Sequence, residues 1–153
     1  MGTTTEAINF RLMEKDDLET VAKLEQEAFS DAWNVSMLAE ELDNRLSTYI
    51  IMLKEQQIIG YAGFMLVVGE ADVTRVAVFK AQRGHGYGNL LTERLVNKAW
   101  ELEAEAITLD VRESNVPAIK AYEKNGFKSV GVRPNYYEKP REGAVIMWLY
   151  KQE

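Results

Sequence analysis

The sequence predicts an α/β protein with a mixed β-sheet of about seven strands and four helices. The first observation is a run of three segments rich in β-forming residues between positions 47 and 78, joined by short polar turns, which is typical of antiparallel strands. The second is the alternation of strand and helix patterns that follows this run. A helix that joins two strands of one sheet makes them parallel, so the predicted sheet contains both kinds of pairing.

The N-terminal third is predicted to contain one strand and two helices. Residues 7–12 alternate weakly between apolar and polar side chains and indicate a short strand. Asp16 and Asp17 place negative charge at the start of a first helix, where the helix dipole favours it. Asn34 is a suitable N-cap for a second, short helix that ends near Leu42.

The middle of the chain is predicted to form three consecutive strands at residues 47–54, 58–68 and 71–78. A long helix over residues 86–103 and a strand over residues 106–112 follow. Because that helix joins the strand at 71–78 to the strand at 106–112, we expect these two strands to be parallel neighbours.

The C-terminal part is predicted to contain the fourth helix and two closing strands. Ser114 or Asn115 caps the helix, and the pair Asn125-Gly126 ends it, since glycine is favoured just after a helix. The two strands are expected at residues 127–137 and 144–150.

Composition limits the classes of function. With 153 residues, 46% hydrophobic and 27% charged, the chain is expected to fold as a single domain over residues 1–153. It has no signal segment and no apolar run long enough to span a bilayer, so we expect a cytoplasmic protein without membrane contact. The net charge of −6 argues against direct nucleic-acid binding and is compatible with a basic peptide or protein partner. The absence of cysteine excludes disulfides, thiolate metal sites and transfer through an enzyme thioester.

A glycine-rich loop between a strand and a helix is the strongest motif. Gly84, Gly86 and Gly88 alternate with other residues, and this arrangement turns backbone N–H groups toward an anion. Arg83 adds a positive charge suited to phosphate. The spacing differs from the dinucleotide fingerprint, and no Gly-Lys-Ser/Thr follows. We interpret the loop as a phosphate or pyrophosphate cradle; a glycine-rich turn before a helix is the alternative.

The loop resembles the R/Q-x-x-G-x-G/A pyrophosphate loop of the GCN5-related N-acetyltransferases. Residues 109–115, 118–127 and 133–137 are similar to the RimI-type ribosomal-protein alanine N-acetyltransferases within that family. The resemblance implies the acyl-CoA N-acyltransferase fold and acetyl-CoA as donor, without a metal. It also implies a protein N-terminus as acceptor, most simply that of a ribosomal protein beginning with alanine.

The resemblance also implies which residues bind the cofactor. Backbone groups of Val76, Ala77 and Val78 pair with the pantetheine arm in the space between the two parallel strands. The remaining candidates belong to the loop, the start of the next helix and the cap of the fourth helix: Arg83, Gly84, His85, Gly86, Tyr87, Gly88, Asn89 and Asn115.

Two residues are candidates for proton transfer. Asp110 is the candidate general base, although related enzymes usually have glutamate there; the alternative is a structural aspartate paired with Arg112 or a backbone amide. The resemblance implies that Tyr122 is the general acid for the leaving thiolate, a role that a phenol with a pKa near 10 can fill. The alternative is a core tyrosine on an amphipathic helix.

The acceptor side is less well defined. By resemblance, Trp33 and Tyr136 contact the substrate, while the alternative for Trp33 is a partly buried anchor of the turn between the first two helices. Tyr136 and Tyr137 should point to opposite faces of one strand, so only one is expected to face the acceptor. The Asp common in the family before the last strand is absent, since this chain has Gly143.

Two other functions remain open from the sequence. One is acetylation of a small amine such as a polyamine or an antibiotic, and the other is a non-catalytic acyl-CoA binding module. A monomer or a weak dimer is expected.

Overall fold

The structure, a computed structural model, describes residues 7–152. Its strands are β1 (Ile8–Leu12), β2 (Ser47–Lys54), β3 (Gln57–Val67), β4 (Glu70–Val78), β5 (Ala106–Arg112), β6 (Lys128–Glu138) and β7 (Arg141–Tyr150). Its helices are η1 (Lys15–Asp17), α1 (Leu18–Ala28), α2 (Val35–Asp43), η2 (Lys80–Gln82), α3 (Tyr87–Glu101) and α4 (Val116–Lys124).

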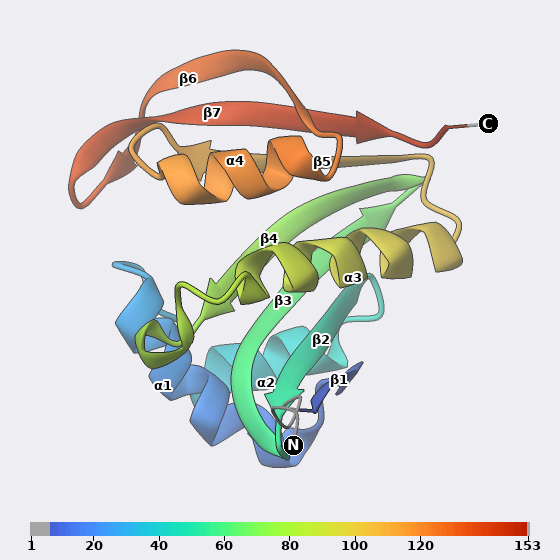
Figure 1. Cartoon of the computed structure of the whole chain (residues 1–153), viewed down its shortest axis with the longest axis vertical. Helices are drawn as coiled ribbons and strands as arrows, with labels where there is room; N and C mark the ends of the chain where they lie inside the picture. The colour runs from blue at the N-terminus through green and yellow to red at the C-terminus, as the bar shows by residue number, and fades with distance from the viewer. Residues whose placement is uncertain (1–6, 153) are drawn as a thin grey trace, which may run out of the picture.

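The strands form one seven-stranded mixed sheet in the order β1-β2-β3-β4-β5-β7-β6 (Figure 1). Strands β1 to β4 pair antiparallel in sequence order, and β7 lies between β5 and β6 with antiparallel pairing on both sides. The pairing of β4 with β5 is parallel, which confirms the expectation from the intervening helix α3. The sequence therefore predicted the fold class and the order of its elements correctly.

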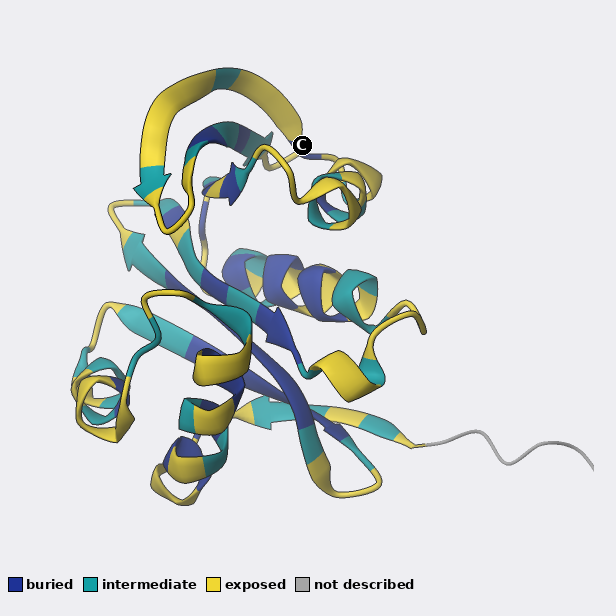
Figure 2. Ribbon diagram, turned by 90° about the vertical axis from the view of Figure 1, so that its left-hand side faces the viewer, coloured by how far each residue is buried: buried dark blue, intermediate teal, exposed yellow. Residues whose placement is uncertain are grey.

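Helices cover both faces of the sheet (Figure 2). Helices α3 and α4 pack on one face through buried side chains such as Leu91, Leu95 and Tyr122. Helices α1 and α2 pack on the other face, over a second core that includes Leu24 and Leu38. Burial of these apolar side chains supplies most of the driving force for folding.

The helix caps agree with the sequence analysis. The side chain of Asn34 accepts a hydrogen bond from the Met37 N–H at 2.9 Å and begins α2. Asn115, rather than Ser114, caps α4 by accepting from the Ala118 N–H at 3.3 Å. Most element boundaries differ by one or two residues from those expected, because the ends of elements are set by the last hydrogen bonds rather than by composition, and β7 begins three residues earlier than expected, at Arg141.

Between residues 7 and 152, no helix is long and apolar enough to cross a membrane.

Candidate active site

The glycine loop follows β4 and the short helix η2 and leads into α3, so it lies between a strand and a helix as the sequence predicts. Gly84 and Gly86 have φ values of +87° and +79°, a backbone region that side chains rarely adopt. A Cβ added at Gly84, Gly86 or Gly88 would meet no atom within 4 Å, so open space lies over the backbone of all three. The loop thus offers close access to its backbone at the N-terminus of a 15-residue helix, where an anion is favoured.

The other residues of the loop region are held from two sides. The Arg83 Nε donates to the carbonyl oxygen of Val78 at 3.2 Å, which ties the loop to the last residue of β4. The side chain of Asn89 accepts from the amide of Asn125 at 2.9 Å, which joins the start of α3 to the end of α4. The rings of His85 and Tyr87 lie 5.5 Å apart. These contacts fix the loop without closing the space over its glycines.

Strands β4 and β5 pair over only a short stretch. Their register runs from Glu70 opposite Ala106 to Asp72 opposite Thr108. In the described residues the remainder of β4, including Val76, Ala77 and Val78, has no register partner on β5. An extended ligand can therefore form backbone hydrogen bonds along this edge of β4, as an added strand would.

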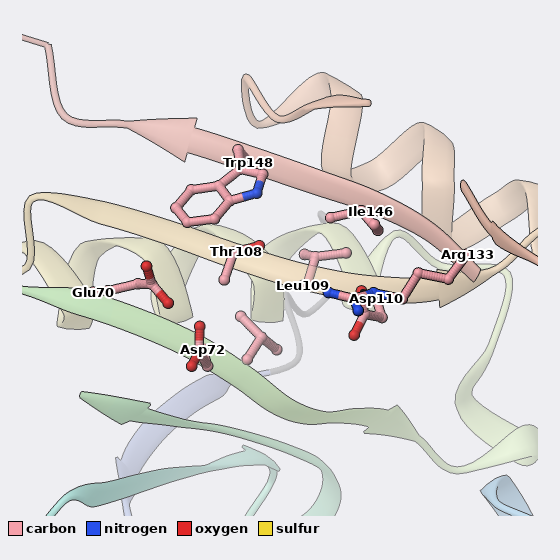
Figure 3. A pocket seen from close by; sticks show the side chains of 9 residues that line it. Glu70, Asp72, Thr108, Leu109, Asp110, Arg133, Ile146 and Trp148 are labelled. Atoms are coloured by element: carbon pink, nitrogen blue, oxygen red, sulfur yellow. The ribbon is translucent and has the colours of Figure 1, made fainter. Parts of the chain in front are cut away.

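A cavity of about 330 Å³ lies beside this divergence, on the face opposite α3 (Figure 3). Its polar lining includes three carboxylates, those of Glu70, Asp72 and Asp110, with Arg133 and Trp148 at its sides. Burial, the contact with Glu70 and the charge of Asp110 together raise the pKa of Asp72 to about 6. The cavity is therefore a negatively charged environment that suits an amine or another cation.

Asp110 points into this cavity from β5. Its closest cation is Arg133, whose Nε lies 3.8 Å from Oδ1. The alternative that Asp110 pairs with Arg112 is wrong, because Arg112 pairs with Glu142 at 3.2 Å and donates to the carbonyl oxygens of Lys139 and Pro140. Asp110 is thus an exposed carboxylate with one weak ionic contact, which leaves it available to accept a proton.

Tyr122 lies on α4, in the core on the opposite face, with its side chain buried against the ring of Phe127 at 5.7 Å. Burial raises the pKa of Tyr122 above its ordinary value, and nearby Tyr137 raises it further. The phenol therefore stays protonated at neutral pH, which is the state a proton donor requires.

The sequence of residues 18–127 matches the acetyltransferase (GNAT) family. The chain belongs to this family. Acetyltransferases of the family take their acetyl group from acetyl-CoA, and two features here fit such a donor: the open space over the glycines and the unpaired edge of β4.

Similar proteins include enzymes named for a ribosomal substrate. The [ribosomal protein bS18]-alanine N-acetyltransferase of Haemophilus influenzae is 36% identical over 141 residues, which cover 90% of this chain and 95% of that protein. The crystal structure of the ribosomal-protein-S18-alanine N-acetyltransferase from Escherichia coli has a TM-score of 0.85 at 27% identity and covers 94% of both chains. A spermidine N-acetyltransferase from Vibrio cholerae has a TM-score of 0.82 at 16% identity, with 94% of this chain and 93% of that chain covered, and shows the shared fold alone.

On the acceptor side of this acetyltransferase, the two adjacent tyrosines of β6 differ in how far they are buried. Tyr137 is half-buried, with the Arg112 guanidinium 4.3 Å from its ring centre, whereas Tyr136 is 50% exposed. Burial, together with the nearby charge of Asp110, raises the pKa of Tyr137 to about 12. Tyr137 is thus within electrostatic reach of Asp110 and of Tyr122, and the sequence analysis did not select it. A contact of Tyr136 with the acceptor stays a prediction.

Trp33 of the acetyltransferase lies in the connection between α1 and α2. Its ring meets that of Tyr49 edge-on at 6.4 Å and lies 4.1 Å from the Arg75 guanidinium. These contacts agree with the alternative that Trp33 anchors the turn, and its expected contact with substrate stays a prediction. No group of three or more potential metal ligands occurs within residues 7–152.

Proposed function

We propose that this chain transfers the acetyl group of acetyl-CoA to the N-terminal α-amine of a protein, and that its acceptor is ribosomal protein bS18 with an N-terminal alanine. The observation that carries the proposal is an acidic cavity that holds Asp110 where β4 and β5 diverge, in a chain whose glycine loop leaves its backbone open after β4. The relative from Haemophilus influenzae, similar over 90% of this chain, supports the choice of acceptor. The protein would act in the cytoplasm, where ribosomal proteins are made.

In this proposal the glycine loop and the cap of α4 hold the donor. Backbone N–H groups of the loop bind the pyrophosphate, with Arg83, His85, Tyr87 and Asn89 around it, and Asn115 adds a polar contact at the start of α4. The edge formed by Val76, Ala77 and Val78 pairs with the extended arm. When bound, acetyl-CoA supplies a thioester carbon open to attack, and coenzyme A is the leaving group.

Two side chains of the protein then carry out the proton transfers. Asp110 accepts the proton that the acceptor ammonium must lose before its nitrogen can attack, directly or through a water. Tyr122 gives its proton to the departing sulfur as the carbon–sulfur bond breaks, and the second proton that the nitrogen releases as the amide forms restores the phenol. Because the chain has no cysteine, the acetyl group passes directly from donor to amine.

The lower pKa of an α-amino group favours a protein N-terminus over a lysine side chain as the acceptor. An α-amino group has a pKa near 8, so roughly a tenth is neutral at pH 7, whereas lysine, with a pKa of about 10.4, is neutral in under a thousandth of molecules. An exposed aspartate with one weak ion pair provides only modest help as a base, which is sufficient for the first acceptor and not for the second.

The first test measures thiol release from acetyl-CoA with two peptides of one sequence. One peptide has a free N-terminal alanine, and the other has a blocked terminus and internal lysines. We expect turnover at least about 100-fold faster on the free terminus, in line with the difference in neutral amine. Comparable turnover on both peptides would contradict Nα specificity. Turnover on neither, with acetyl-CoA still bound, would favour a small amine or a non-catalytic module.

A second test uses the pH dependence of Asp110→Asn. We expect kcat to fall about 100-fold near pH 6, where the acceptor is mostly protonated, and far less near pH 9, where it is mostly neutral. Loss of the weak contact with Arg133 should cost little stability, because ion pairs between exposed groups contribute little. Asp110→Glu keeps the carboxylate and should retain activity near pH 6. An equal loss at every pH would assign Asp110 a structural role.

A further inference from the structure

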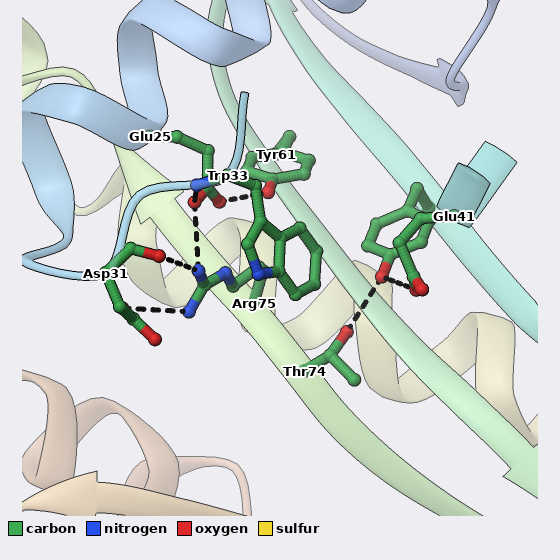
Figure 4. A network of polar contacts seen from close by, with 8 residues as sticks. Glu25, Asp31, Trp33, Glu41, Tyr61, Thr74 and Arg75 are labelled. Atoms are coloured by element: carbon green, nitrogen blue, oxygen red, sulfur yellow. Dashed lines mark hydrogen bonds and ion pairs between the residues drawn. The ribbon is translucent and has the colours of Figure 1, made fainter. Parts of the chain in front are cut away.

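A buried polar cluster joins β4 to α1 and to the connection that follows α1 (Figure 4). The carboxylate of Glu25, on α1, is fully buried and lies 3.0 Å from the Arg75 guanidinium of β4. The same carboxylate accepts the hydroxyl hydrogen of Tyr61 and the backbone N–H of Trp33, the latter at 2.9 Å. Three elements of the fold and one loop residue therefore meet at a single side chain.

The other hydrogen-bond, ion-pair and ring contacts of the Arg75 side chain within residues 7–152 are with the α1–α2 connection (residues 29–34). The rings of Phe29 and Trp33 each lie with their centres 4.1 Å from its guanidinium carbon. Its Nη2 donates to the carbonyl oxygen of Asp31 at 3.2 Å, and its Nη1 lies 3.6 Å from the Asp31 carboxylate. A planar cation between two rings, with a carbonyl at its edge, restrains the position of this connection.

Stability alone does not account for such a cluster. A buried ion pair loses its hydration, and apolar residues of similar volume often stabilise a core as well or better. The Arg75 Nε is also buried without a hydrogen-bond partner, which adds to the cost. What the cluster does provide is a fixed position for residues 29–34.

The connection lies on the same face of the sheet as the proposed acceptor site, because α1 and α2 pack on the face opposite α3 and the cavity that holds Asp110 lies on that face as well. The charge of Asp31 contributes to the raised pKa of Tyr137, so the connection and the end of β6 are within electrostatic reach of each other. Asp110 acts on the same tyrosine from β5. Asp31 itself is 78% exposed at its side chain, so this edge of the connection faces solvent.

We propose that Arg75 is a positioning residue for the acceptor: it holds the α1–α2 connection as one wall of the acceptor site and thereby sets acceptor affinity. This proposal rests on the proposed function. Arg75 directly precedes Val76 on β4, but its side chain points to the face that packs against α1, whereas the donor is expected to pair with backbone groups at the edge of β4, so donor binding should change little when the guanidinium is replaced.

The test compares Arg75→Lys with Arg94→Lys. Lysine at position 75 keeps a positive charge near Glu25 but lacks the plane that fits between two rings. Arg94 also lies over a ring, that of Phe10 at 4.6 Å, but on α3 and away from the connection, so it is a chemically matched control. In Arg75→Lys we expect the KM for the alanine peptide to rise about tenfold, because small displacements of positioning groups weaken productive binding. The KM for acetyl-CoA and the kcat should stay within about twofold of the parent in both variants.

Hydrogen exchange of the Trp33 amide gives a readout that does not depend on turnover. This N–H donates to Glu25, and we expect it to exchange at least about tenfold faster in Arg75→Lys, while Arg94→Lys leaves it unchanged. An unchanged acceptor KM, or an equal rise in the KM of donor and acceptor, would overturn the positioning role. If the parent protein does not acetylate the peptide at all, the proposed function fails. In that case the exchange rate of the Trp33 amide in Arg75→Lys still tests whether Arg75 fixes the connection. An unchanged rate would contradict this role, and a faster rate would support it.

Discussion

Replacing Tyr122 with phenylalanine is expected to lower kcat by about 10²- to 10⁴-fold, with both KM values within about twofold of the parent. The thiolate that leaves acetyl-CoA is a poor leaving group unless it is protonated, and a buried phenol with a raised pKa is a neutral donor at working pH. The variant removes the hydroxyl and keeps the ring that packs against Phe127, so the fold should be preserved. Steady-state kinetics of thiol release gives both parameters.

The matched control for this variant is Tyr150→Phe. It removes a hydroxyl from the last residue of β7, on a side chain that is 61% exposed, and should leave kcat unchanged. Thermal unfolding of both variants distinguishes lost chemistry from lost fold. If Tyr122→Phe turned over at the rate of the parent, Tyr122 would have no part in proton transfer and would be the core tyrosine of the alternative interpretation.

The donor side of the site can be predicted from sequence because its cues are local. A strand, alternate glycines and a helix follow one another without interruption, and each is determined by residues a few positions apart. The parallel neighbour of β4 follows from the single helix between β4 and β5. Local patterns therefore place the glycine loop and Asp110 at neighbouring strand ends before any tertiary contact is known.

The acceptor side depends on features that local patterns do not contain. Counting alternate residues along β6 does not tell which tyrosine faces inward, because the register with β7 shifts between Arg133 and Tyr137, and Asn135 takes a φ of +55°. The half-buried tyrosine is Tyr137, whereas the family resemblance pointed to Tyr136 for contact with the acceptor. Likewise, Asp72 lies near Asp110 only because the parallel register sets Asp72 opposite Thr108.

Arg75 is the clearest case of a residue whose role is invisible in the sequence. A lone arginine in a strand is usually on the surface, yet this one is buried. Its partners come from α1 and from residues 29–34, and nothing in the spacing of these segments indicates that they meet at β4. Only the packing of α1 across the sheet brings Glu25 to it.

The largest effect on stability is expected from Glu25→Met. Removing one partner of a buried ion pair leaves the other charge without compensation, which typically costs about 3–5 kcal/mol. Here the variant also removes the acceptor of the Tyr61 hydroxyl and of the Trp33 N–H. Urea unfolding at neutral pH should show this loss as a lower midpoint with an unchanged slope.

A double-mutant cycle with Arg75→Met separates the contribution of this pair to stability from its contribution to acceptor binding. Arg75→Met alone should also cost about 3–5 kcal/mol, because it leaves the Glu25 carboxylate buried and unpaired. The double variant should cost at least about 2 kcal/mol less than the sum, since no uncompensated charge remains. Additive costs would instead mean that the two side chains act on stability independently. A further informative outcome is a double variant that regains stability and still shows a raised KM for the acceptor. That result would mean that an apolar pair supports the same fold, and that the charged pair serves chiefly to position the α1–α2 connection.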